Sequence, residues 1–364
     1  MFFKTLELQN FRNYDTLNLK FDPHINIIVG KNGQGKTNIL ESLYYIAYLK
    51  SHRVNDENIL IKNNKKSFKI KSKIKRETLL DEVKIEQTLD DKKVFFNQTE
   101  MVKRGEYLEL INIILFEPTN LEILKGSPNV RRYFLNDVIS QINGNYYNVL
   151  NDFNRLLKMR NEFLKSNRND KDYLDSLDKY YVEKASIIYQ MRSKYINRVN
   201  EFISNIYKDI MNIDGLKIEY KSFYEKLEDK NQIKDALLQE LHKNYNKEKY
   251  LGSTIEGPQK DDFCFMIMDK NLKEYGSQGQ QRGAVISLKF AEAEIVKKYK
   301  NVIPVFLLDD VFSELDGIRK NNLIKYITSD YQVILTTTDL AKISKKLITE
   351  AKIIEIKNGE IVGG

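Results

Sequence analysis

One short glycine-rich segment constrains this chain more than any other part of its sequence. Residues 30–37 fit the pattern G-x-x-x-x-G-K-[ST]. A nearly continuous apolar run, Ile25–Val29, precedes the segment, and apolar residues recur at helical spacing after it. A strand, a glycine-rich loop and a helix in this order form a phosphate-binding unit, because glycines let backbone N–H groups face an anion at the helix N-terminus. The alternative is a glycine-rich turn with an exposed lysine.

The last two residues of this loop supply the reactive side chains of such a unit. Lys36 can reach the β- and γ-phosphates of a nucleoside triphosphate, and the Thr37 hydroxyl can ligate Mg²⁺. The sequence therefore predicts a site for ATP and Mg²⁺ that is formed by Gly30, Lys31, Asn32, Gly33, Gln34, Gly35, Lys36 and Thr37.

Two acidic residues follow a second apolar run, residues 305–308. Asp309, at the carboxyl end of such a strand, can hold Mg²⁺ beside a phosphate loop. The adjacent Asp310 can polarise the attacking water. Aspartates at strand ends also form turns and cap helices, which is the alternative when the pair is taken alone.

A third motif precedes a helical pattern near residue 280. It reads Ser277-Gln278-Gly279-Gln280-Gln281-Arg282. A hydroxyl, a glycine and two glutamines at a helix start form an anion-binding surface that lacks a carboxylate. An ordinary helix N-cap that contains a glycine is the alternative.

The length of 364 residues allows two domains, or one large domain with an insertion. The spacing of apolar residues changes from strand-like to helical near residue 128 and becomes strand-like again near residue 250. We therefore predict a discontinuous mixed α/β core from residues 1–127 and 250–364. Residues 128–249 are predicted to form an inserted α-helical lobe.

Composition excludes several classes of protein. The single cysteine, Cys264, excludes an internal disulfide and a cysteine-rich zinc site. No apolar stretch approaches the ~18 residues of a membrane span, and the first residues lack a secretory pattern. These features favour a cytoplasmic protein without a membrane partner. The 59 basic and 51 acidic residues give a net charge of +8, which favours an anionic partner such as nucleic acid.

The order of the motifs resembles that of ATP-binding-cassette (ABC) ATPases. The phosphate loop, Ser-Gln-Gly-Gln, the apolar-Asp-Asp run and Ser313-Glu314-Leu315-Asp316 follow one another. The interval from Lys36 to Ser277 is too long for a transporter subunit and far too short for the coiled coil of an SMC or Rad50 chain.

Further phrases are similar to those of the RecF family, and the resemblance covers essentially the whole chain. They are Phe11-Arg12-Asn13-Tyr14, Gly35-Lys36-Thr37-Asn38, Ser51-His52-Arg53, Leu124-Lys125-Gly126-Ser127-Pro128 with Arg131-Arg132, Arg160-Asn161 and Thr336-Thr337-Thr338-Asp339.

The resemblance implies an ABC-type ATPase core with roles for the matched residues. Asn38 would join the loop residues in binding ATP and Mg²⁺. Asp309 would be the Mg²⁺ carboxylate, and Asp310 stands where many relatives have a catalytic glutamate. Thr338 takes the place of the switch histidine of transporters, which is consistent with slow hydrolysis.

The resemblance also implies contacts between two subunits. The γ-phosphate held by one subunit would be bound by Ser277, Gly279 and Gln280 of the other. Residues 313–316 would lie at the dimer interface.

Two departures from the family pattern limit this transfer of roles. The segment Gly257-Pro258-Gln259-Lys260-Asp261-Asp262 stands where the family usually has Gly-Pro-His-Arg-Asp-Asp. Lys260 keeps the charge, but the imidazole is lost, so no catalytic role is assigned to Gln259. The Mg²⁺-contacting Q-loop has one candidate, Glu117 followed by Pro118.

A basic segment suggests where DNA would bind. Eight basic residues and no acidic residue occur between positions 61 and 76. Four of them alternate with other residues and would share one face of a strand, namely Lys69, Lys71, Lys73 and Lys75. Such a face neutralises phosphates without reading bases. The alternative is an edge strand that its lysines protect from aggregation.

The functions that remain belong to different classes. The RecF resemblance implies an ATP-dependent homodimer that clamps duplex DNA and single-strand/double-strand gap junctions. It also implies slow, DNA-stimulated ATP hydrolysis, with RecR and RecO as partners and RecA loading as the outcome. A related SMC- or Rad50-like ATPase that clamps a protein partner is the alternative. An inactive scaffold is a third hypothesis, against which the presence of Lys36, Thr37, Asp309 and Asp310 argues.

Overall fold

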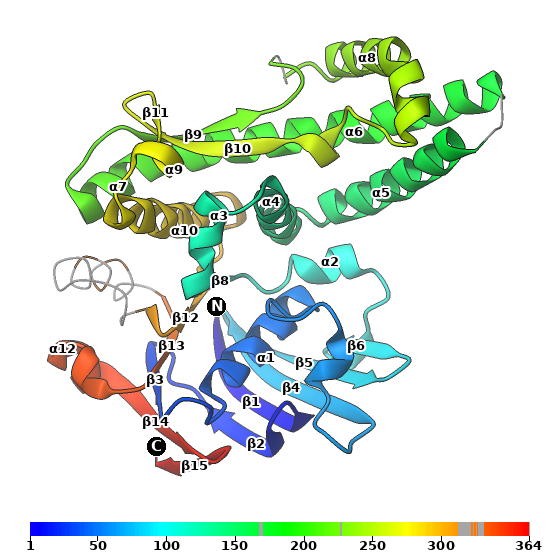
Figure 1. Cartoon of the computed structure of the whole chain (residues 1–364). Coiled ribbons are helices and arrows are strands. Elements are labelled where there is room, and N and C mark those ends of the chain that lie inside the picture. Colours follow the sequence, from blue (N-terminus) through cyan, green and yellow to red (C-terminus); the bar gives the residue numbers. More distant parts are fainter. Residues whose placement is uncertain are drawn as a thin grey trace. The chain divides into compact units, whose positions relative to one another are not determined.

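The computed structural model describes residues 1–166, 170–225, 228–311, 322, 324, 326 and 331–363. The chain divides into two compact units, which are coloured by sequence in Figure 1. The α/β unit consists of Met1–Asn120, Asp209–Asn212 and Lys289–Gly364. The helical unit consists of Leu121–Lys208 and Ile213–Leu288. Both chain ends therefore belong to the α/β unit, as the discontinuous pattern of the sequence predicted.

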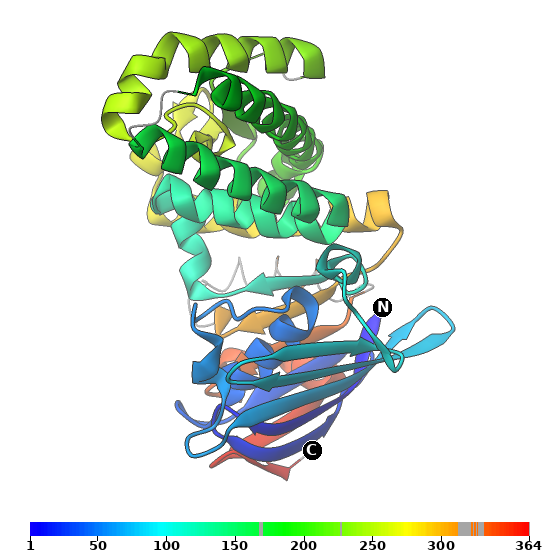
Figure 2. The same cartoon turned by 90° about the vertical axis from the view of Figure 1, so that its right-hand side faces the viewer.

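The first sheet of the α/β unit is antiparallel, with the strand order β2-β1-β4-β5-β6-β7. Its long strands lie side by side in Figure 2. Along β4 the apolar side chains are buried and the lysines are half-buried, which confirms the predicted alternation. The strands are β1 (Phe2–Phe11), β2 (Tyr14–Lys20), β4 (Ser67–Arg76), β5 (Leu79–Thr88), β6 (Lys92–Phe96) and β7 (Thr99–Glu100).

The second sheet has the order β15-β14-β3-β13-β12-β8, and all of its pairs are parallel except β14–β15. Strands β3, β12 and β13 are mainly apolar and almost wholly buried, as expected for a sheet covered on both faces. The strands are β3 (Ile25–Val29), β8 (Ile113–Phe116), β12 (Val305–Asp309), β13 (Val333–Thr337), β14 (Ala351–Lys357) and β15 (Glu360–Gly363).

Helix α1 (Lys36–Tyr48) joins the two sheets into one core. Nearly all of its residues are buried, and its apolar side chains belong to a single cluster with residues of both sheets. A helix with so many buried residues requires cover on nearly every side. Shorter helical segments among the described residues of this unit are Glu57–Leu60, α2 (Arg104–Leu108), Leu340–Lys342 and α12 (Lys345–Glu350).

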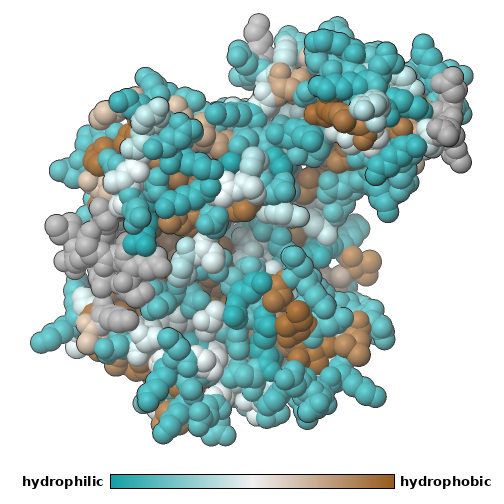
Figure 3. Space-filling view, in the orientation of Figure 1, coloured by the Kyte–Doolittle hydropathy of each residue, from teal (hydrophilic) through white to brown (hydrophobic). Residues whose placement is uncertain are grey.

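Amphipathic helices dominate the helical unit. Figure 3 shows a surface over α5, α6 and α8 that is mainly hydrophilic with some apolar residues, and the larger part of their apolar residues is buried or half-buried. The helices are α3 (Glu122–Lys125), α4 (Pro128–Ile142), α5 (Gly144–Lys165), α6 (Lys171–Asn200), α7 (Ile203–Met211), α8 (Lys230–Leu251), α9 (Leu272–Tyr275) and α10 (Gln278–Lys300). Helices α7 and α10 continue into the α/β unit, and Pro118–Leu121 and Pro258–Lys260 are short 3₁₀ segments. None of the helices in the described ranges combines the length and apolarity of a membrane crossing.

The boundaries of the units differ from the expected ones. Residues 250–288 were expected in the α/β core, whereas the structure groups them with the helical unit. The reason is a three-stranded sheet of β9 (Leu216–Lys221), β10 (Asp262–Ile267) and β11 (Lys270–Asn271). Strand β9 interrupts the stretch that was expected to be helical throughout, and its pairing with β10 keeps the following residues in this unit.

Buried charges hold the helical unit together around the segment 257–262. Arg192 of α6 is 2% exposed and donates hydrogen bonds to the Pro258 carbonyl at 2.6 Å and to Oδ2 of Asp261 at 2.9 Å. Its remaining N–H groups reach the Tyr146 hydroxyl and Oδ1 of Asn136. The two aspartates that end the Gly-Pro motif of the sequence therefore have structural partners here, because Asp262 pairs with Arg131.

Replacing Arg192 with leucine is expected to lower the free energy of unfolding by about 3–5 kcal/mol, because Asp261 would stay buried without its partner. Urea unfolding followed by circular dichroism measures the change. Lys184→Gln is the matched control on the same helix, since its pair with Asp152 is partly exposed and such pairs contribute about 0–1 kcal/mol. Equal losses for the two variants would contradict the structural role of the buried pair.

Candidate nucleotide site

The carboxyl ends of four parallel strands meet at one edge of the second sheet. Strands β3, β13, β12 and β8 are neighbours in register. The glycine-rich loop begins at Gly30 directly after β3, Thr336 lies in β13, Asp309 ends β12 and Glu117 follows β8. Ligands of open α/β sheets bind at this edge, so the topology assembles a candidate site from distant parts of the chain.

The loop has the backbone that its glycines predict. Gly33 and Gly35 have φ angles of 78° and 103°, in the region that favours glycine. A side chain at Gly35 would also meet the hydroxyl of Tyr14 at 2.6 Å from its Cβ. Lys31, Asn32 and Gly33 are exposed, and the side-chain oxygen of Gln34 accepts a hydrogen bond from the backbone N–H of Asn358.

Lys36, the first residue of α1, lies inside the curve of this loop. Its Nζ donates hydrogen bonds to the carbonyls of Gly30 at 2.7 Å and Lys31 at 2.9 Å. Burial lowers the pKa of Lys36, and the charges of Asp309 and Asp310 oppose that shift. The ammonium group is therefore held by neutral carbonyls close to two carboxylates.

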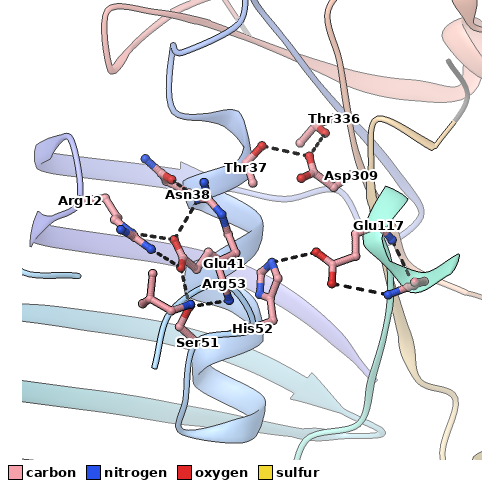
Figure 4. A network of polar contacts seen from close by, with 12 residues as sticks. Arg12, Thr37, Asn38, Glu41, Ser51, His52, Arg53, Glu117, Asp309 and Thr336 are labelled. Carbon is pink, nitrogen blue, oxygen red and sulfur yellow. Dashed lines mark hydrogen bonds and ion pairs between the residues drawn. The ribbon is translucent and has the colours of Figure 1, made fainter. Parts of the chain in front are cut away.

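The next residue, Thr37, reaches the acidic end of β12. Its Oγ1 donates a 3.1 Å hydrogen bond to Oδ1 of Asp309, from 272 positions away in the sequence (Figure 4). A second hydroxyl, that of Thr336, donates to the same oxygen at 2.6 Å. The following residue, Asp310, has a φ of 49° and donates its backbone N–H to the Thr336 hydroxyl at 3.1 Å. The structure thus brings together Thr37 and the two predicted acidic residues.

The sequence analysis did not identify a buried acidic residue on α1. Glu41 is fully buried and binds Arg12 through two hydrogen bonds of 2.8 and 2.6 Å. Ser51 donates to the same carboxylate at 2.6 Å and Arg53 at 3.3 Å. Burial acts to raise the pKa of Glu41, but the hydrogen bonds from Arg12 and Ser51 outweigh it and the pKa lies below its ordinary value. A charged residue among the apolar positions of a buried helix was the signal that could have indicated it.

The same network reaches the loop through Asn38. Arg53 donates to Oδ1 of Asn38 at 2.8 Å, and Nδ2 of Asn38 donates to Oδ1 of Asn13 at 2.8 Å. Asn13 in turn donates to the carbonyl of Gln34 at 3.4 Å. Two phrases that carried the resemblance, around residues 11–14 and 51–53, therefore meet beside the phosphate loop.

Glu117, the candidate for the Q-loop, lies against His52. Their closest atoms, Oε2 and Nε2, are 3.5 Å apart. Burial lowers the pKa of His52 to about 4, so its imidazole is neutral at neutral pH. Burial also raises the pKa of Glu117. This pair was not predicted, because the three histidines of the chain show no pattern in the sequence.

The Ser277 motif lies in the helical unit, at the start of α10. The backbone N–H of Ser277 donates to Oε1 of Gln280 at 2.8 Å, and that of Gln280 donates to Oγ of Ser277 at 3.3 Å. These reciprocal bonds satisfy two donors at the helix start, as a capping box does. Gly279 is the second residue of the helix. Thr338 follows β13 and is half-buried, and residues 313–316 lie outside the described residues.

The lysine face of β4 carries ion pairs that the sequence did not indicate. Lys69 pairs with Glu86 at 2.8 Å and Lys71 with Glu82 at 3.1 Å, both across the β4–β5 ladder. Lys75 donates to the Thr78 carbonyl. The face is therefore less positive than four unpaired lysines would make it.

The comparisons with known proteins agree with this arrangement. The model of the RecF/RecN/SMC N-terminal domain matches residues 2–360. The DNA replication and repair protein RecF of Ligilactobacillus salivarius strain UCC118 is 35% identical over 370 residues, which cover 99% of this chain and 97% of that protein.

Two solved structures of "the recombination mediator protein RecF" in the RecFOR pathway are similar over 99% of this chain. The one described as RecF-ATPrS has a TM-score of 0.92 at 28% identity and is covered to 97%. The one described as RecF-ATP has a TM-score of 0.91 at 29% identity and is covered to 96%. The fold, the loop geometry and the full-length similarity lead to one conclusion, which is that the chain belongs to the RecF family.

Proposed function

We propose that this chain is a cytoplasmic, ATP-dependent recombination mediator that binds DNA. One observation carries the proposal, namely the 3.1 Å hydrogen bond that joins Thr37 of the phosphate loop to Asp309 of β12. Mg²⁺ prefers oxygen ligands such as hydroxyl and carboxylate groups. The phosphate oxygens of a nucleotide supply further ligands at such a site. A solved relative is described as RecF-ATP, which supports ATP as the nucleotide.

ATP binding rests on the loop and on the residues around it. The backbone N–H groups between Gly30 and Gly35 surround the phosphates, and Lys36 exchanges its two carbonyl partners for phosphate oxygens. Thr37 and Asp309 hold Mg²⁺, which neutralises charge on the phosphates when it is bound. Asn38, two residues after Lys36, also contributes to the binding of ATP and Mg²⁺.

Hydrolysis, in this proposal, uses Asp310 and a second copy of the chain. Asp310 orients and deprotonates the attacking water, which makes the protein an ATPase. The γ-phosphate held by one copy is bound by Ser277, Gly279 and Gln280 of the other, so ATP promotes a homodimer. Thr338 occupies the switch position without an imidazole, and we expect turnover to be slow and to be stimulated by DNA.

The proposed DNA substrate is duplex DNA and the single-strand/double-strand junction of a gap. The chain has an excess of eight basic charges, and phosphate contacts need no base readout. Solved relatives are described as mediators in the RecFOR pathway, which supports RecR and RecO as partners and the loading of RecA as the outcome.

Sedimentation of the purified chain tests the proposal. It is run with ATP·Mg²⁺, with ADP and without nucleotide, each with and without a gapped duplex. A dimer that forms only with ATP and stays on the DNA supports the clamp. A monomer that ignores both nucleotide and DNA would contradict it, and an ATP-dependent dimer that ignores DNA would favour an ATPase that clamps a protein partner.

Replacing Lys69, Lys71, Lys73 and Lys75 with glutamine is expected to reduce the salt dependence of DNA binding. Each lysine that neutralises a phosphate contributes roughly 0.9 to the slope of log K against log salt. Fluorescence anisotropy at several salt concentrations measures that slope. The matched control replaces Lys230 and Lys234, which both pair with Glu183 in the helical unit, and leaves the slope unchanged. An unchanged slope in the fourfold variant would assign the DNA surface to another part of the chain.

A further inference from the structure

A single hydroxyl connects the two acidic residues of the candidate site. It belongs to Thr336 of β13, whose register partner across the parallel β12–β13 pair is Asp309. Its Oγ1 lies 2.6 Å from Oδ1 of Asp309 and 3.1 Å from the backbone nitrogen of Asp310. The sequence assigned no task to this residue.

The chemistry of the partners fixes the direction of both hydrogen bonds. An ionised carboxylate only accepts, so Thr336 donates its single hydrogen to Asp309. A backbone N–H only donates, so the same oxygen accepts from Asp310. Thr336 is 2% exposed, so its hydroxyl is largely shielded from bulk water. Serine could form the same two bonds, whereas valine has the same shape and could form neither.

Both bonds act on atoms whose placement matters for the site. Oδ1 of Asp309 receives Thr37 at 3.1 Å and Thr336 at 2.6 Å, while its Oδ2 has no hydrogen-bond partner among the described residues. The carboxylate is thus held by one oxygen and open at the other. Asp310 has a φ of 49°, which is uncommon outside glycine, and the bond to Thr336 secures that backbone.

We propose that Thr336 is a positioning residue of the ATPase site. Its hydroxyl holds Asp309 so that Oδ2 is free for the Mg²⁺-nucleotide, and it fixes the backbone from which the carboxylate of Asp310 extends. The inference rests on the proposed function and adds a specific residue to it.

The test compares Thr336→Val with Thr336→Ser. A fluorescent ATP analogue is titrated at increasing Mg²⁺, and turnover is measured at saturating ATP. Loss of a residue that orients a metal ligand costs roughly 10- to 100-fold in metal affinity or activity. The valine variant is therefore expected to need roughly 10- to 100-fold more Mg²⁺ for half-maximal binding. The serine variant is expected to behave like the unchanged chain, and a serine variant as impaired as the valine variant would overturn the inference.

A matched control separates positioning from a general loss of stability. Thr254 of the helical unit is also buried, donates to Oδ1 of Asn161 at 2.8 Å and accepts from Arg160 at 2.8 Å. Thr254→Val is expected to lower the unfolding temperature without changing the Mg²⁺ midpoint. A similar change of that midpoint in both variants would overturn the positioning role. If Thr336→Val does not fold, Thr336→Cys replaces it, and its weaker donor must still raise the midpoint above that of Thr336→Ser.

The outcomes for the unchanged chain and the variants are distinguishable. A chain that binds no ATP analogue at any Mg²⁺ concentration would refute the proposed function itself. A chain that binds the analogue, together with a folded Thr336→Val variant of equal Mg²⁺ dependence, would refute the role of Thr336 alone.

Discussion

The variant Lys36→Ala is expected to bind ATP at least roughly 100-fold more weakly than the unchanged chain, since charge-assisted hydrogen bonds to phosphates contribute about 1.5–3 kcal/mol each. The structure adds a second reason for the loss. Nζ of Lys36 donates to the carbonyls of Gly30 and Lys31, and alanine leaves both carbonyls and the loop without that support. Equilibrium titration with a fluorescent ATP analogue measures the change.

The same variant is expected to stay monomeric in ATP, because the proposed dimer is held by the bound nucleotide. Lys103→Ala is a suitable control, since Lys103 is an exposed lysine of the α/β unit that pairs with Glu106. Circular dichroism shows whether Lys36→Ala remains folded. Ordinary ATP affinity in a folded Lys36→Ala variant would contradict the assignment of the phosphate loop.

The loop and its acidic partner were predictable because their chemistry is local. The φ angles of Gly33 and Gly35 are what the glycines of the motif predict, and parallel strands necessarily bring their carboxyl ends to one edge. Two short motifs therefore sufficed to predict that Thr37 and Asp309 would meet.

Features that depend on pairing across the fold were not predictable in the same way. The pairing of β9 with β10 joins residues 216–221 to 262–267, and no local sequence pattern predicts this pairing. Cross-strand register likewise decides that Lys69 faces Glu86. The environment of Glu41 was not predictable for the same reason, because its partners Arg12 and Arg53 lie before and after α1 in the sequence.

The environment of Thr336 explains why the sequence analysis assigned no role to it, although Thr336 belongs to a phrase that carried the resemblance. A threonine in an apolar strand is ordinary, since β-branched residues favour strands. Only its register opposite Asp309 places its hydroxyl between the two acidic residues. Sequence motifs thus predicted the groups that are proposed to contact the nucleotide, whereas the fold was needed to find the residue that is proposed to orient them.

The variant Asp310→Asn is expected to bind ATP normally but to hydrolyse it roughly 100-fold or more slowly, because general base catalysis contributes about 10²–10⁴-fold to such reactions. Asparagine is nearly isosteric with aspartate and tolerates a positive φ comparably well, so it retains the backbone at 49° and the N–H donated to Thr336. The variant should therefore accumulate as an ATP-bound dimer on DNA.

Comparison with Asp309→Asn separates the roles of the two acidic residues. Asp309→Asn removes the carboxylate that Thr37 and Thr336 contact, and we expect it to weaken Mg²⁺-dependent ATP binding itself. Single-turnover hydrolysis and sedimentation on a gapped duplex distinguish a trapped dimer from an empty monomer. Rapid turnover by Asp310→Asn would exclude this carboxylate as the base. The mechanism would then have to use another acid at the same edge of the sheet, and Glu117, which follows β8 and whose pKa is raised by burial, is the next residue to replace.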